Sequence, residues 1–482
     1  MIGSSIAHRW LRRGAVCAVA GLAGACASAS VSGPTRTSLS AADVALLDTV
    51  QRRTFDFFWE RTDARTGLTP DRWPTPSFSS IAAVGFALTA YPIGVERGWI
   101  TRTQAAERAL STLRFFWTSP QGPAASGTIG HKGFFYHFLD MASGVRFRDV
   151  ELSTIDTALL LAGVLFCQTY YDRDVPDEVA IRAYADSLYR RVEWTWIQPN
   201  RPLVNHRWRP SDGFGTHDWR GYDESMILYI LALGSPTFPI EPSAWNAFTT
   251  TNRWLSFYGQ AHVNFAPLFG HQYSHIWIDF RGIQDDYMRA RGGGIDYFEN
   301  SRRATISQRA YAIANPRRFR DYSADTWGLT AADGPIDSVM TIDAQSIQFW
   351  TYSARGAAAT EVRDDGTIAP TAAASSIAFA PEIVMPAIRA MRTRYGDALF
   401  QRYGFLDSFN PTLRDPRVPV RHGRVDATLG WFNGDYLGID QGPIVTMIEN
   451  YRTELVWSTM RRNPYIVQGL LRAGFRNGWL GR

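Results

Sequence analysis

Helical stretches that are apolar on every side alternate along this chain with stretches that are apolar on one side only. The first kind includes SSIAAVGFALTAYPIGVERGW and STIDTALLLAGVLFCQTYY, and the second includes TRTQAAERALSTLRFFW and PDEVAIRAYADSLYRRVEWTW. A helix that is apolar all round must be enclosed by other elements, whereas an amphipathic helix covers a core and faces water. The alternation therefore predicts inner helices surrounded by outer ones.

The hydrophobic period predicts about six inner helices. They are expected near residues 79–95, 153–171, 221–233, 275–285, 372–386 and 440–451. Two concentric rings of helices accommodate this pattern, so we expect an all-α fold, an (α/α)6 barrel, over residues 41–482 as one domain.

Strand signals are weak by comparison. Residues 127–151 alternate enough to predict a small hairpin between helices. The alanine-rich segment 369–382 is expected to be a loop that enters a helix.

The first 26 residues have the pattern of an export signal. Arg9, Arg12 and Arg13 precede a short apolar run that ends in LAGAC, as in a bacterial lipoprotein signal, so Cys26 is predicted to be the lipidated first residue of the mature chain. Cleavage without lipidation within ACASA is the alternative. Residues 27–40 are expected to be a flexible linker. Both alternatives predict an exported protein, periplasmic or anchored in the outer membrane.

Composition excludes several classes of partner and cofactor. The net charge of +5 falls to +2 without the three N-terminal arginines, and no later segment is densely basic, so nucleic acid is not an expected partner. No phosphate-cradling glycine loop, dinucleotide fingerprint or nucleophile elbow occurs, and no cofactor is expected. Cys167 lies in an apolar helix and is expected to be a core residue. We expect a monomer.

Acidic residues gather where inner helices are expected to begin. These residues are Glu151, Asp156, Asp223, Glu224, Asp279, Asp435 and Asp440. Any one of them could simply cap its helix. Several acids on one rim, together with Trp219, Trp277, Trp327 and Trp431, favour a site for sugars. In such a site one protonated carboxyl group donates its proton to the leaving oxygen, and another activates water or attacks the sugar.

His271, His275 and Asp279 are spaced four residues apart, which on a helix would align three metal ligands. No second ligand cluster accompanies them. We therefore expect no metal, and the two histidines are predicted to bind sugar or to be structural.

Six motifs together resemble those of the glucoamylase-like domain family, which includes bacterial endo-β-1,2-glucanases of glycoside hydrolase family 144. They are GYDESMILYILALGSPT, HQYSHIWIDFRGIQD, GIDYFENSRRAT, WGLTAADGP, DDGTIAPTAA and GIDQGPIVTMIENYR, in this order over about residues 45–478. The resemblance implies an (α/α)6 barrel and metal-independent hydrolysis of β-1,2-glucan with inversion.

The resemblance also implies roles for individual residues. Glu224 matches the general acid, Asp440 the base side, and Glu151 and Asp156 acids along the substrate cleft. Many relatives have Asn where this chain has Asp223, and the extra carboxylate would either raise the pKa of its neighbour or cap the helix. The expected substrate-binding residues are Trp219, Tyr222, His271, His275, Trp277, Asp279, Arg281, Trp327 and Trp431.

Four alternatives remain open at this point. A related enzyme could release sophorose from chain ends, or could rearrange glucan chains by transglycosylation. A surface lipoprotein could bind glycan without cleaving it. A polysaccharide lyase on the same fold would use a Tyr/His pair such as Tyr136 and His137, although no specific Arg accompanies that pair.

Overall fold

The computed structural model describes residues 39–291 and 293–481. The predicted signal segment and most of the predicted linker, including Cys26, lie outside the described residues. The described chain belongs to one compact unit that begins at Leu39. Within it, no helix is both long and apolar enough to cross a bilayer.

Helices with little exposed surface form the centre of this unit. They are α2 (Ile81–Glu96), α4 (Thr154–Tyr170), α6 (Met226–Gly234), α8 (Tyr273–Trp277), α11 (Pro370–Ala374) and α13 (Gly438–Thr453). Contacts connect α2 to α4, α4 to α6, α6 to α8, α8 to α13, and α13 back to α2, while α11 packs on α13. The inner helices therefore contact one another in a closed cycle.

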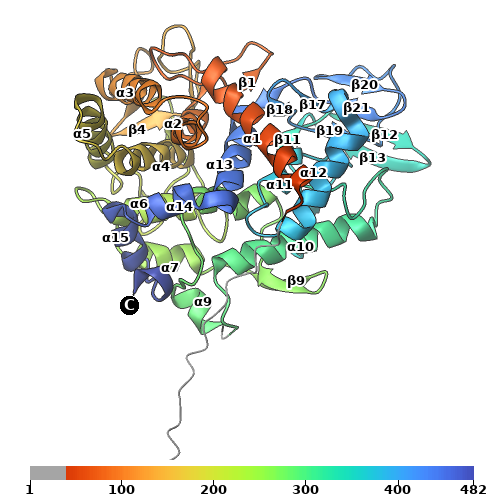
Figure 1. The fold of residues 1–482 in the computed structure, drawn as a ribbon. Coiled ribbons are helices and arrows are strands. Elements are labelled where there is room, and N and C mark those ends of the chain that lie inside the picture. The colour runs from red at the N-terminus through yellow and green to blue at the C-terminus, as the bar shows by residue number, and fades with distance from the viewer. Residues whose placement is uncertain (1–38, 292, 482) are drawn as a thin grey trace, which may run out of the picture. The chain divides into compact units, whose positions relative to one another are not determined.

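Amphipathic helices cover this cycle from outside. In Figure 1, α3 and α5 lie beside α2 and α4, and their contacts agree. Likewise α1 contacts α2 and α13, α12 contacts α11, and α15 contacts α6. The covering helices are α1 (Ala41–Arg61), α3 (Arg102–Thr118), α5 (Pro176–Arg190), α12 (Pro381–Tyr395) and α15 (Pro464–Arg472), and the remaining helices are α7 (Ser243–Thr249), α9 (Asp286–Ala290), α10 (Tyr297–Ala314) and α14 (Leu455–Met460).

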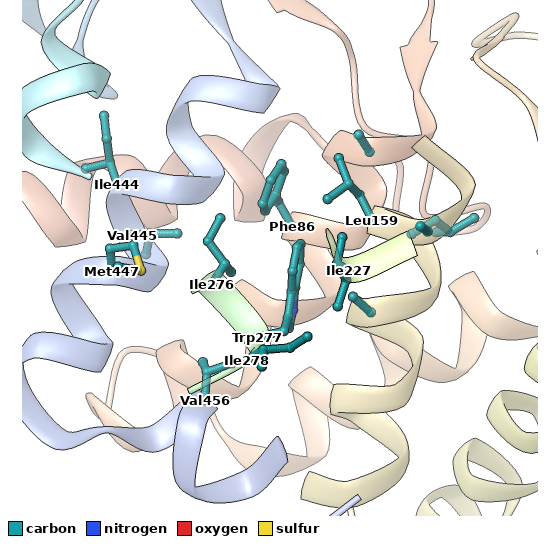
Figure 2. Packing of buried hydrophobic residues seen from close by; sticks show 14 of the residues in the cluster. Phe86, Leu159, Ile227, Ile276, Trp277, Ile278, Ile444, Val445, Met447 and Val456 are labelled. Atoms are coloured by element: carbon teal, nitrogen blue, oxygen red, sulfur yellow. The ribbon is translucent and has the colours of Figure 1, made fainter. Parts of the chain in front are cut away.

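Figure 2 shows side chains from several inner helices meeting at the middle of the cycle. Phe86 of α2 stacks on Trp277 of α8 with ring centroids 5.3 Å apart. Leu159, Ile227 and Val445, from α4, α6 and α13, lie around them (Figure 2). All five side chains are buried, and each large apolar side chain contributes roughly 1.5–3 kcal/mol when it leaves water.

Two glycines let α2 and α4 approach closely. A Cβ on Gly85 would lie 2.3 Å from the carbonyl oxygen of Leu159, and one on Gly163 would lie 2.2 Å from that of Gly85. Such distances are sterically forbidden, so the two backbones can touch here only because both positions are glycine.

Three of the six inner helices are found near the predicted bounds, and three differ. The third begins at Met226, five residues after the predicted start. The fourth ends at Trp277, because the Asp279 carboxylate accepts the Arg281 N–H and thereby closes a turn that competes with the helix. The fifth divides into α11 and α12, since Ala380 precedes a proline and adopts φ −147°, outside the helical region.

The expected hairpin within 127–151 is present, and it belongs to a larger sheet. Strands β3 (Gly130–His131) and β4 (Phe134–Tyr136) pair antiparallel, and the sheet continues through β6 (Leu152–Ser153), β7 (Arg207–Arg209) and β8 (Gly213–Phe214). This sheet leads the chain directly into α4, because β6 ends at the N-cap of that helix.

Several other short strand pairs were not predicted. Two of them matter for the site: β1 (Arg72–Trp73) pairs with β22 (Tyr436–Leu437), and β11 (Ala331–Asp333) pairs with β14 (Tyr352–Ala354). The others are β2 (Ser79–Ser80), β5 (Phe138–Leu139), β9 (Trp254–Phe257), β10 (Gln260–Val263), β12 (Ser338–Ile342), β13 (Gln345–Phe349), β15 (Gly356–Ala357), β16 (Val362–Arg363), β17 (Phe400–Gln401), β18 (Gly404–Phe405), β19 (Phe409–Asn410), β20 (Arg424–Asp426) and β21 (Gly430–Phe432).

Candidate active site

Asp223 and Glu224, here called the α6 carboxyl pair, lie in the turn that precedes α6. Gly221 has φ +85°, which permits this turn before the apolar helix begins. Ser274 holds the turn from the side, because its Oγ donates to the carbonyl oxygen of Glu224 at 2.8 Å and accepts the N–H of Ile227 at 3.0 Å. Both carboxyl side chains remain partly exposed.

The environment of the α6 carboxyl pair disfavours two negative charges. Loss of water contact raises the pKa of Asp223, although the N–H and hydroxyl of Ser225 donate to its Oδ1 and oppose this shift. Loss of water contact and the neighbouring charge of Asp223 raise the pKa of Glu224 well above its ordinary value. Of the two, Glu224 is therefore the member whose protonated form is the more strongly favoured.

Asp407 and Asp440, here called the α13 carboxyl pair, form a second such arrangement. Both are buried, and their side chains hydrogen-bond to each other. Oδ2 of Asp407 accepts from Asn433 Nδ2 at 2.7 Å, Ser408 Oγ at 3.0 Å and the Asp333 N–H at 3.0 Å. No donor group among the described residues reaches the buried oxygens Asp407 Oδ1 and Asp440 Oδ2.

These contacts imply that the α13 pair shares one proton. Burial and the charge of Asp407 raise the pKa of Asp440 well above its ordinary value, and burial and the charge of Asp333 raise that of Asp407. Asp407 receives three donors and Asp440 receives none on its carboxyl group within the described chain, so the negative charge is better stabilised on Asp407.

Two consecutive residues of α8 connect the two carboxyl pairs, because each one hydrogen-bonds to the backbone at one pair. The Tyr273 hydroxyl donates to the carbonyl oxygen of Ile439, directly before Asp440, at 3.3 Å, while Ser274 binds the carbonyl oxygen of Glu224. Burial raises the pKa of Tyr273, and the charges of Asp440, Glu224 and Asp156 raise it further. The acids at the starts of three inner helices thus lie within electrostatic range of one phenol.

Glu151 and Asp156 are held on either side of His137. His137 Nδ1 lies 2.8 Å from Glu151 Oε1, and its Nε2 lies 3.4 Å from Asp156 Oδ2. Burial opposes a charge on His137, but the two carboxylates outweigh it and raise its pKa to about 9. The hydrogen bond from His137, with a further one from Arg209, lowers the pKa of Glu151 to about 2. Glu151 is therefore ionised and cannot serve as the acid.

More acids, one arginine and one tyrosine adjoin the α13 pair. Arg72 Nη1 lies 2.8 Å from Asp333 Oδ2, and Arg72 also pairs with Asp71 at 3.4 Å and with Asp435 at 3.8 Å. Tyr352 lies opposite Asp333 in the β11–β14 pair, with 54% of its surface exposed. Its ring offers an exposed apolar surface beside these carboxylates.

The structure corrects the prediction for most of the aromatic residues. Trp277, Trp327 and Trp431 are fully buried, and Trp219 and Tyr222 are nearly so. Trp277 Nε1 donates to Thr89, and Trp431 Nε1 donates to the carbonyl oxygen of His422. These side chains pack the core and cannot stack on a sugar ring, although Tyr222 and Trp219 adjoin the Glu224 turn in sequence.

The two histidines and Asp279 are also internal, and the partly exposed Arg281 is bound to Asp279. His271 lies between the Tyr222 hydroxyl and the carbonyl oxygen of Phe265, both at 3.1 Å, and His275 Nε2 binds Ser301 at 3.0 Å. Burial lowers the pKa of both rings. Asp279 is buried and takes two hydrogen bonds from the Arg281 guanidinium. The substrate-binding roles predicted for these four residues are therefore replaced by structural ones.

The sequence did not reveal Asp71, Asp333, Asp407, Tyr273 or Tyr352 as site residues. Each lies in a short strand, a connection or the short helix α8, where no periodic pattern marks it. A usable signal did exist for Asp407, because DSFN places an acid, a hydroxyl and an amide within four residues, which is a set that can build a carboxylate site.

Comparison with known proteins identifies the family of this chain. A family model described as "Putative glucoamylase" matches residues 216–464, which is more than half of the chain and includes Glu224, Asp407 and Asp440. The chain belongs to this glucoamylase-like family. The resemblance stated from the six motifs is thereby confirmed.

Individual members of the glucoamylase-like family are similar over most of this chain. A putative glucoamylase from Bacteroides uniformis ATCC 8492 is 32% identical with a TM-score of 0.77, covering 92% of this chain and 100% of that one. An endo-β-1,2-glucanase from Chitinophaga pinensis, solved with sophorotriose and glucose, is 26% identical with a TM-score of 0.75 over 92% of this chain and 100% of that one.

A curated relative has a named activity. The chain is 29% identical over 472 residues to an exo β-1,2-glucooligosaccharide sophorohydrolase (non-reducing end) of Parabacteroides distasonis. That alignment covers 90% of this chain and 58% of the relative, so the chain spans less than two thirds of that protein's length.

Proposed function

We propose that this protein is a glycoside hydrolase that cleaves β-1,2-glucan within the chain. The observation that carries the proposal is the pair of hydrogen bonds by which Tyr273 and Ser274, neighbours in α8, bind the backbone next to Asp440 and the backbone of Glu224. This link supports a site in which Glu224 and the α13 carboxyl pair act on one substrate. The named activities of the Chitinophaga pinensis and Parabacteroides distasonis relatives supply the linkage.

Glu224 is the general acid in this proposal. Its raised pKa keeps a proton available at neutral pH, and the proton passes to the glycosidic oxygen as the bond to the anomeric carbon breaks. Asp223 keeps that pKa high through its charge, which gives a role to the second acid at this turn.

The α13 carboxyl pair acts on the base side. A water molecule attacks the anomeric carbon from the opposite face, with inversion, and loses a proton to the Asp407–Asp440 pair. The pair holds one proton at rest, so it can accept a second one. His137 holds Glu151 and Asp156 on either side of its ring, where both serve as acceptors for sugar hydroxyl groups.

The proposal extends to architecture and location. The closed cycle of contacts among inner helices, covered by amphipathic ones, supports an (α/α)6 barrel. The N-terminal pattern supports export and a lipid on Cys26, as a monomer in the periplasm or at the outer membrane. Incorporation of labelled fatty acid into the wild type, and its loss in Cys26→Ala, tests the lipid anchor.

Product analysis tests the activity. The purified mature chain is incubated with linear β-1,2-, β-1,3- and β-1,4-glucans, and the products are separated by chromatography. We expect β-1,2-glucan alone to yield a range of oligosaccharides from early times. Sophorose as the only early product would replace endo by exo action, and glucan binding without new reducing ends would contradict catalysis.

A further inference from the structure

An arginine-rich pocket opens beside the carboxyl groups of the proposed active site. It has a volume of about 550 Å³, within the range of roughly 300–1,000 Å³ typical of pockets for small ligands. Arg72 belongs to its wall and also binds Asp333, so the pocket borders the α13 carboxyl pair through this one side chain. The other residues that define its chemistry are Phe78, Phe147, Arg148, Arg421 and His422.

The charge of this pocket is opposite to that of the neighbouring site. None of its lining residues is acidic. Arg148 and Arg421 are exposed, and neither forms an ion pair within the described parts of the chain. Asp337 lies within electrostatic range of Arg421, but its carboxylate is already bound by the N–H and hydroxyl of Thr351. Two guanidinium groups therefore remain available to a ligand.

An aromatic wall connects the pocket to the site. Phe78 packs at a tilt against Phe147 with centroids 4.8 Å apart and against Phe138 at 4.0 Å, and Phe138 stacks on His137 at 3.8 Å. The Arg148 guanidinium lies 5.0 Å from the centre of the Phe147 ring. A half-buried apolar surface with guanidinium groups at its edge suits a sugar ring that carries a negative charge.

We propose that this pocket binds a sugar unit of the glucan that bears an anionic substituent, a carboxylate or a phosphate group. The inference rests on the proposed function, because the substituted unit belongs to the chain that is cleaved between Glu224 and the α13 pair. The ring lies against Phe78 and Phe147, and Arg148 and Arg421 donate charge-assisted hydrogen bonds to the substituent. The enzyme is thus selective for glucans that are both β-linked and negatively charged.

The test compares three forms of one linear β-1,2-glucan, substituted to the same low degree with carboxymethyl, phosphate or neutral hydroxyethyl groups. The readout is the ratio of kcat/KM for each anionic form to that for the hydroxyethyl form, at low ionic strength. In the wild type we expect ratios above one for both anionic forms. Preference for only one of them would identify which anion the pocket takes.

Arg148→Ala and Arg421→Ala should each lower that ratio about tenfold, the effect of losing one charge-assisted hydrogen bond. Arg148→Lys should restore part of it, because the charge remains while the planar fork is lost. Arg65→Ala removes an arginine whose side chain is 87% exposed elsewhere on the surface and should leave the ratio unchanged.

Equal ratios in the wild type and the double variant Arg148→Ala/Arg421→Ala would overturn the inference. If the wild type cleaves none of the three glucans, the proposed function fails, and calorimetric titration then decides the inference alone. Tighter binding of the carboxymethyl or phosphate glucan than of the hydroxyethyl glucan, abolished in the double variant, would support it, and equal binding would reject it.

Discussion

In each of the two carboxyl pairs, two acidic side chains lie so close that both cannot easily be ionised, and the two pairs avoid this repulsion in different ways. Asp223 and Glu224 are neighbours in sequence, stand in a partly exposed turn, and differ because Ser225 stabilises the charge on Asp223 alone. Asp407 and Asp440 come from distant segments, are buried, and share a proton directly. The first arrangement favours a protonated Glu224 that can donate its proton. The second leaves the Asp407–Asp440 pair able to accept a proton.

The largest effect is expected from Glu224→Gln. The amide cannot donate a proton to the leaving oxygen, so kcat on β-1,2-glucan should fall by about 10³-fold or more. Initial rates from reducing-end assays measure this loss. Glu241→Gln, at an exposed position on the outside, is the matched control and should retain wild-type activity. A loss of only a few-fold in Glu224→Gln would remove Glu224 from the mechanism.

The α13 carboxyl pair should lose activity as a unit. Asp440→Asn and Asp407→Asn are each expected to lower kcat about 10²-fold, since either change removes the shared proton and the site that accepts the second one. The double variant should lose little more than the worse single variant, because residues that act together are not additive. Additive losses in this double-mutant cycle would show that the two aspartates act independently.

A smaller effect on rate, with a shift in pH dependence, is expected for Asp223→Asn. Removing the Asp223 charge lowers the pKa of Glu224, so Glu224 loses its proton at a lower pH. The alkaline limb of the kcat profile should therefore move toward lower pH, while kcat at the optimum changes only a few-fold. An unmoved alkaline limb would mean that Asp223 only closes the turn before α6.

The smallest effect on catalysis is expected for Asp279→Asn, a carboxylate that the structure places outside the site. Asp279 is buried and paired with Arg281 and Arg461. Breaking this arrangement should lower the free energy of unfolding by about 1–3 kcal/mol, because the partly exposed guanidinium groups of Arg281 and Arg461 lose the buried charged acceptor that they share. Urea unfolding measures the change, and kcat at low temperature should stay near the wild-type value. A lost kcat in a folded variant would return Asp279 to the site.

The sequence predicted the parts of the fold that depend on periodicity. Helices α2, α4 and α13 lie close to their expected bounds, because long apolar runs specify buried helices. The proline at 381 and the turn at Asp279 shortened two other helices through local contacts that the hydrophobic period does not contain. Short strand pairs such as β11–β14 depend on partners far along the chain.

The candidate site was predicted where acids mark the start of a helix, as for Glu224 and Asp440. Asp407 and Asp333 were not predicted, since they lie in a connection and a short strand that long-range hydrogen bonds bring together. The tryptophans were misassigned for a different reason. Their number in the sequence does not distinguish core packing from sugar stacking, and the structure buries Trp277, Trp327 and Trp431 completely.

Helix α8 has only five residues, yet two of them bind segments that are far apart in the sequence. Tyr273 donates a hydrogen bond to the backbone next to Asp440, and Ser274 donates one to the backbone of Glu224. Because these two positions are adjacent in one short helix, they tie the backbone beside Asp440 to the backbone of Glu224. The proposed function therefore predicts that related chains differ in their outer connections while α8 keeps the same two backbone contacts.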